Sequence, residues 1–264
     1  MLVERCRIRV WSEAGTQHNL QAAINSLPPE TFFRIFELIQ GDNSWPIAPP
    51  GFVFRRHFPA LPPRRNQWIA VTAVCRRWRK IALGDPFLWN TLCIEKTADA
   101  QYYLEWIGRS ACVPLNLLIH DYEYAQGLFA EKFSEWCPRL RRLEIRTLRK
   151  PDMLTLFKQR APQLEILTIL NDRHDITCLP AIFSDHTPRL NYVFLDHIIP
   201  PTPQLLSNLT HVTLKSPPWT SVRQVVDLLR ANPTMQSLVL CSAYIRSVVD
   251  PLVEGAAKIG RAHV

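Results

Sequence analysis

The densest group of residues capable of acid–base or metal chemistry is the sequence NDRHD at residues 171–175. Two carboxylates and an imidazole this close together can bind a metal ion or exchange protons. An active site needs further partners, and the sequence contains no HExxH motif, nucleophile elbow or glycine-rich phosphate loop. We therefore interpret the segment as a solvated turn, and we predict a protein that is not an enzyme and has no cofactor.

Cysteine usage gives no metal site either. The seven cysteines are odd in number, the closest pair is eighteen residues apart, and no CxxC motif occurs. Reduced thiols in the cytoplasm or the nucleus are the simplest interpretation. Residues 1–11 lack the apolar region of a secretion signal, and no run approaches the roughly 18 apolar residues of a membrane span. We expect a protein without a membrane segment.

The formal charge of +8 raises the possibility of a nucleic-acid partner. Groups of cations lie within residues 55–65, 76–80 and 139–150, but they form no single contiguous run, and no zinc-finger or glycine-aromatic motif accompanies them. A solvated basic surface explains them better, and such a surface also attracts acidic proteins. Nucleic-acid binding stays as the alternative.

Two helices are predicted near the N-terminus. Residues 68–82 place most of their apolar side chains within roughly 140° of a helical wheel, opposite a group of cations. A second helix is expected from Pro29 to the glycine at position 41, with apolar residues over roughly 220° of arc, about twice what one core requires. That surplus predicts a second apolar surface that covers it, supplied either by the rest of this chain or by another protein.

These segments resemble a known domain. The sequences LPPE at residues 27–30, IF at 35–36, VCRRWRKIA at 74–82 and LW at 88–89 resemble the F-box pattern in the form common in fungal F-box proteins. Thr31, where the family usually has an aliphatic residue, and the long insert at residues 41–66 are departures.

The resemblance implies a helical cluster that docks on the Skp1 adaptor of a cullin-RING ubiquitin ligase, with the C-terminal region capturing a protein substrate. A non-ligase scaffold is the other reading of an F-box. The adaptor-binding candidates carried over by the resemblance are Leu27, Pro28, Ile35, Phe36, Val74, Cys75 and Trp78.

The C-terminal half repeats itself. The pattern PRLRRLEI at residues 138–145 recurs from residues 162, 188 and 233, with a degenerate copy from Ser207. This spacing matches the roughly 20 to 29 residues of leucine-rich repeats, in which each unit supplies one strand and one helical return. The resemblance to this family implies a curved parallel sheet built from stacked units. An α/β domain with accidental similarity is the alternative.

The substrate would meet the strands and the turns that follow them. The predicted substrate-binding residues are Arg146, Asp172, Arg173, His174, Phe194, His197 and Lys215.

The predicted fold is therefore an α+β or α/β solenoid with a small helical F-box cluster at its start. We expect an unassigned arm at residues 1–22, an F-box-like domain at 23–92 with the proline-rich insert 41–66, and a leucine-rich-repeat-like substrate-binding domain at 93–250. Residues 251–264 lose the repeat period, and their IGRAHV ending resembles a translated sequencing adapter.

Overall fold

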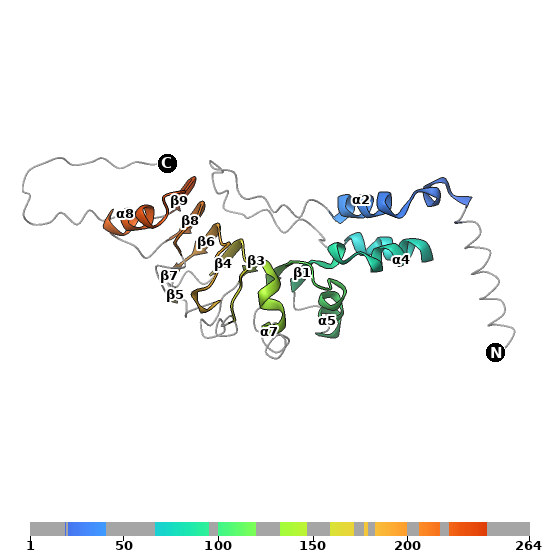
Figure 1. The fold of residues 1–264 in the computed structure, drawn as a ribbon, viewed down its shortest axis with the longest axis horizontal. Coiled ribbons are helices and arrows are strands. Elements are labelled where there is room, and N and C mark those ends of the chain that lie inside the picture. Colours follow the sequence, from blue (N-terminus) through green and yellow to red (C-terminus); the bar gives the residue numbers. More distant parts are fainter. Residues whose placement is uncertain are drawn as a thin grey trace, which may run out of the picture.

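The computed structural model describes residue 19 and residues 21–40, 67–94, 100–119, 133–146, 159–171, 177–178, 183–199, 206–216 and 222–241. The insert at residues 41–66, the tail at 251–264 and nearly all of the N-terminal arm lie outside these ranges. The described residues form a helical end followed by a parallel sheet (Figure 1).

The helical end begins with η1 (Ala23–Ser26) and α2 (Pro29–Gln40). The single helix predicted over residues 68–82 is instead three elements, η2 (Gln67–Ala70), α3 (Val71–Val74) and α4 (Arg76–Gly84). Cys75 interrupts them with an extended backbone (φ −157°, ψ 171°). The Nε of Arg79 donates to the carbonyl of Thr72 at 2.7 Å, so a side chain satisfies a backbone group that the break leaves open.

A short helix, η3 (Pro86–Trp89), joins this end to the sheet. Asp85 precedes it, and its side chain accepts a hydrogen bond from the backbone N–H of Phe87 at 3.0 Å. This is an N-cap. Desolvation by burial raises the pKa of the Asp85 carboxyl, and the backbone hydrogen bond opposes that rise.

Seven parallel strands form the main sheet in the order in which they occur along the chain. They are β1 (Thr91–Ile94), β2 (Leu115–Ile119), β3 (Leu140–Ile145), β4 (Ile166–Leu170), β6 (Tyr192–Asp196), β8 (His211–Lys215) and β9 (Ser237–Cys241). The intervening elements are α5 (Ala100–Arg109), α7 (Phe133–Trp136), η4 (Cys137–Arg139), η6 (Phe183–Asp185), α8 (Val222–Ala231) and a two-stranded sheet of β5 (Thr177–Cys178) and β7 (Ile198–Ile199).

The register of the sheet follows the sequence repeat. Leu143 pairs with Leu167, Leu167 with Val193, Val193 with Val212 and Val212 with Leu238, and these are the equivalent positions of the five repeat copies. The same row extends back to Leu117 and Leu92. A second aliphatic row runs two residues further along each strand, at Ile94, Ile119, Ile145, Ile169, Leu195, Leu214 and Leu240.

These two rows form one hydrophobic core. All of their side chains are buried except those of Leu238 and Leu240, which are partly buried at the end of the sheet. Positions that alternate with the rows lie on the other face. Many of them are buried too, and Phe194, predicted to face a substrate, is among them. Its burial fits a parallel sheet, whose strands are commonly covered on both faces, and its role in substrate binding stays a prediction.

Three tryptophans connect the helical end to the sheet. Trp68 in η2, Trp89 in η3 and Trp106 in α5 pack edge to face, with ring centroids 4.9 to 5.5 Å apart. The guanidinium of Arg109 lies 4.9 Å from the ring centroid of Trp89. Since η2 and η3 flank α4 while α5 follows β1, these contacts join the two parts of the molecule into one continuous core.

The indole N–H groups of this cluster differ in their partners. The Nε1 of Trp89 donates to the carbonyl oxygen of Ala82 at 2.9 Å, near the end of α4, while the buried Nε1 of Trp106 has no partner in the described structure. We expect Trp89→Phe to lower the free energy of unfolding by about 1 to 3 kcal/mol more than Trp106→Phe, because only the former leaves a buried carbonyl unpaired. Urea denaturation of both variants measures the difference, and equal losses would contradict it.

Candidate docking surfaces

The inner face of α2 is held on α4 by aromatic side chains. Phe32 and Phe36 are fully buried, and their ring centroids lie 5.3 and 5.4 Å from that of Trp78. The two phenylalanines are one helical turn apart, so both reach the same indole. This pairing fixes which side of α2 turns away from the core.

Polar contacts fix the entry to α2. The Nε1 of Trp78 donates to the side-chain oxygen of Asn25 at 2.8 Å, and the Nη2 of Arg77 donates to the carbonyl of Leu27 at 2.6 Å. The guanidinium of Arg77 also lies 5.6 Å from the ring centroid of Phe32. Two residues of α4 therefore hold the chain in place just before α2 begins.

The outer side of α2 is apolar and exposed. Leu38 and Ile39 are 66% and 47% exposed, and Ile35, three and four residues earlier, is partly buried. Residues at this spacing lie on one face of a helix. Thr31 and Pro28 continue the line toward the start of the helix. We call Pro28, Thr31, Ile35, Leu38 and Ile39 the α2 stripe.

The predicted adaptor-binding residues are divided between the core and the surface. Phe36 lies entirely in the core, so its side chain is not part of any exposed surface. Pro28 and Val74 are exposed, the latter by 56%. Leu27, Ile35, Cys75 and Trp78 are partly buried. Val74 faces solvent, whereas the continuous helical wheel over residues 68–82 placed it on the apolar side.

Leu38 and Ile39 are missing from the predicted residues, although they are the most exposed apolar side chains of α2. The helical wheel could have identified them, since both belong to the wide apolar arc of residues 27–40. The predicted residues of this helix were those of the F-box motif at residues 27–30 and 35–36, which does not include Leu38 or Ile39. A helix with a surplus apolar face shows the surplus at the residues farthest from its packing partner.

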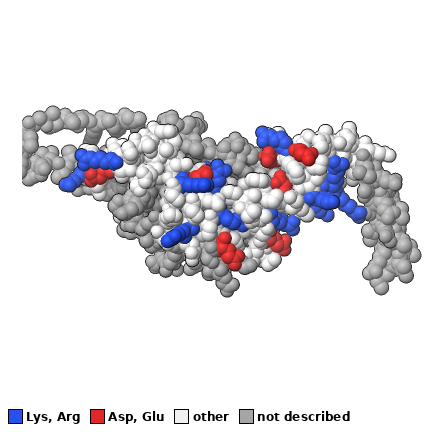
Figure 2. All heavy atoms as spheres, in the orientation of Figure 1, with Lys and Arg blue, Asp and Glu red and all other residues white. Residues whose placement is uncertain are grey.

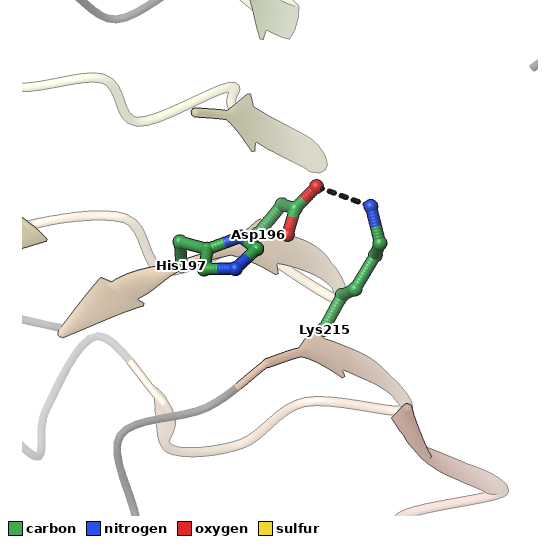
Figure 3. A network of polar contacts seen from close by, with 3 residues as sticks. All are labelled: Asp196, His197 and Lys215. Atoms are coloured by element: carbon green, nitrogen blue, oxygen red, sulfur yellow. Dashed lines mark hydrogen bonds and ion pairs between the residues drawn. The ribbon is translucent and has the colours of Figure 1, made fainter. Parts of the chain in front are cut away.

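A second group of polar side chains lies at the ends of strands β6 and β8. The carboxylate of Asp196 has one oxygen 2.6 Å from the Nδ1 of His197 and the other 2.8 Å from the Nζ of Lys215 (Figure 3). Asp196 and Lys215 are register partners on neighbouring strands. His197 has a positive φ of 56°. The contacts satisfy a buried carboxylate and stabilise this edge of the sheet.

The neighbouring groups do not supply a nucleophile. Cys241 pairs in register with Lys215, and burial raises the pKa of its thiol, so the neutral form is favoured near pH 7. Within the part of the chain that the structure describes, no group of three or more His, Cys, Asp or Glu side chains could hold a metal ion.

The structure brings together some of the predicted substrate-binding residues. His197 and Lys215 meet at Asp196, and Arg146, at the end of β3 on the same edge, has its Nε 2.6 Å from the carboxylate of Glu144. The other predicted loop residues, Asp172, Arg173 and His174, lie outside the described residues.

No helix among the described residues has the length and apolarity to cross a membrane.

Comparison with known proteins bears on the helical end. No curated protein matches the chain. Residues 24–95 match the family model described as F-box-like, a range that contains α2, α3, α4 and the first strand of the sheet. The chain therefore carries an F-box-like domain at its helical end.

Proposed function

We propose that this protein is a non-catalytic F-box substrate receptor. Its F-box-like domain docks on a Skp1-type adaptor and through it on a cullin, and its sheet recruits a target protein for ubiquitin transfer. The observation that carries the proposal is the coincidence of the family match at residues 24–95 with the exposed α2 stripe. An apolar surface of this kind on a helix is typical of a site for another protein.

The α2 stripe and Val74 supply the proposed adaptor contact. Fully covering a Leu, Ile or Val side chain is worth about 1.5 to 3 kcal/mol. Leu38, Ile39 and Val74 are each about half exposed or more, so a partner that covers them gains a substantial part of that free energy. The buried Phe32, Phe36 and Trp78 contribute by holding the surface in shape.

For the sheet we propose a leucine-rich-repeat-like solenoid that binds the target. The strands follow one another across the sheet in chain order, and each pairs with the previous one at an interval of one sequence repeat. Repeat proteins bind ligands with the turns that follow their strands. Arg146, His197 and Lys215 occupy such positions and are proposed to contact the target.

We also propose a cytoplasmic or nuclear location, which the free thiols of Cys75, Cys93, Cys112, Cys137 and Cys241 support. A protein that binds nucleic acid through its basic surface is the alternative function, supported by the formal charge of +8.

Size-exclusion chromatography of the full chain with a purified Skp1-type adaptor tests the proposal. We expect one co-eluting complex, and addition of the matching cullin is expected to give a larger one. Elution of the chain and adaptor as separate peaks at micromolar concentrations would reject the receptor function. A complex with the adaptor that excludes the cullin would point to a scaffold outside a ligase.

A further inference from the structure

The outer face of α4 carries exposed cations. On a wheel with 100° per residue, Arg76, Arg79 and Lys80 fall within about 100° of arc. Trp78 and Ala82, which pack on the core, lie on the opposite side. All three cations are exposed, and Figure 2 shows Lys and Arg atoms gathered at this end of the molecule. We call these residues the α4 basic face.

Two cations of this face, Arg79 and Lys80, are not neutralised by acidic side chains of the described structure. Among the described residues, neither Arg79 nor Lys80 has a carboxylate within ion-pair distance, and the contact of Arg79 with the Thr72 carbonyl is to a neutral group. Many cations elsewhere on the molecule are paired, as in Arg109–Glu105, Arg141–Glu165, Lys215–Asp196 and Arg230–Asp227. The charges of Arg79 and Lys80 are therefore directed toward solvent.

Apolar side chains accompany the charge. Leu83 lies in the middle of the same arc and is 37% exposed, and Phe87 in η3 just beyond the helix is also exposed. A partner protein whose surface has apolar residues among acidic ones can contact both the cations and these apolar side chains. A phosphate backbone gains little from Leu83, and nucleic-acid affinity depends on neutralising many phosphates, for which this short helix offers few cations. The surface fits an acidic protein better than a nucleic acid.

We propose that the adaptor presents an acidic, partly apolar surface toward the F-box-like domain, and that the α4 basic face steers the two proteins together. This inference rests on the proposed function, because it takes the adaptor as the partner. Unscreened charges near an interface accelerate encounter far more than they slow dissociation. The effect weakens as the Debye length falls from about 10 Å at 0.1 M salt to about 3 Å at 1 M.

The test is the association rate of the full chain with a purified Skp1-type adaptor, measured by stopped-flow mixing at low and high salt. We expect Arg79→Gln with Lys80→Gln to slow association roughly five-fold at low salt, with little change in the dissociation rate. Near 1 M salt the variant and the unmodified chain are expected to associate at about the same rate.

Two matched variants separate local charge from other causes. Arg223→Gln with Arg230→Gln removes the same net charge from α8, at the opposite end of the described chain, and is expected to keep the normal rate. Arg79→Lys with Lys80→Arg keeps both charges while it removes the guanidinium that bonds Thr72. This variant is also expected to associate with the adaptor at the normal rate. If Arg79 acted only by holding the Thr72 carbonyl, the loss of its guanidinium would slow association.

The outcomes distinguish this inference from the function on which it rests. If the Arg79/Lys80 glutamine variant binds the adaptor at the normal rate, the steering role is wrong and the receptor function stands. If the unmodified chain does not bind the adaptor, both are wrong. Loss of binding to mixed-sequence single-stranded DNA in that variant, with adaptor association unchanged, would assign the α4 basic face to nucleic acid and overturn the inference.

Discussion

Replacement of Leu38 by glutamate is expected to weaken adaptor binding at least about thirty-fold while the chain stays folded. Leu38 is the most exposed apolar side chain of the α2 stripe, so the change removes no packing from the core. In the complex it would bury an unpaired carboxylate, and altering a central hot-spot residue of an interface costs about 2 to 4 kcal/mol, which is a factor of about 30 to 900 in affinity. Glutamate also keeps a good helix propensity. Isothermal titration calorimetry with the adaptor measures the loss.

A matched control is Leu229→Glu on α8, where another apolar side chain is 46% exposed at the far end of the sheet. It is expected to leave adaptor affinity unchanged. Phe36→Ala is a poor probe by comparison, because its full burial predicts a loss of about 3 to 5 kcal/mol in folding free energy. Full affinity in the Leu38 variant would show that the α2 stripe does not contact the adaptor.

The second large effect is expected at Asn232, just after α8. Its side chain is buried and makes three hydrogen bonds to backbone groups: it accepts from the N–H of Leu209 at 2.6 Å and donates to the carbonyls of Leu206 and Leu228 at 2.6 and 2.7 Å. Asn232→Leu removes all three and leaves the partners without hydrogen bonds. We expect a loss of about 3 to 5 kcal/mol in the free energy of unfolding.

Urea denaturation followed by circular dichroism measures this loss. Gln236→Leu, the same kind of change at an exposed position four residues later, provides the comparison and is expected to alter stability by less than about 0.5 kcal/mol. Similar effects of the two substitutions would mean that Asn232 does not stabilise the last part of the sheet through its amide.

The sheet was largely predictable because its register repeats in the sequence. In stacked units, equivalent positions become neighbours, so the interval from Leu167 to Val193 predicts their pairing directly. The sequence does not show which segments cover each face of the sheet. The burial of Phe194 depends on the packing of other segments, which the alternation of one strand does not reveal.

The helical end was less predictable in detail. The helical periodicity of apolar residues is continuous over residues 68–82, and no residue type in it marks Cys75 as a break. The extended backbone at Cys75 accompanies the contacts of Trp78 with Phe32 and Phe36, which lie far away in the sequence. Tertiary contacts decide this, as they do for the tryptophan cluster of Trp68, Trp89 and Trp106, whose members are too far apart in sequence to form a motif. The wide apolar arc of α2 did predict an exposed surface.

The strand order has a consequence for how the chain is made. Each strand of the main sheet pairs with the strand that precedes it in that sheet, so no pairing has to wait for a strand that is made later. Every new strand that leaves the ribosome therefore has its neighbour in the sheet already synthesised. Synthesis and assembly can thus advance together, from the tryptophan cluster outward to β9.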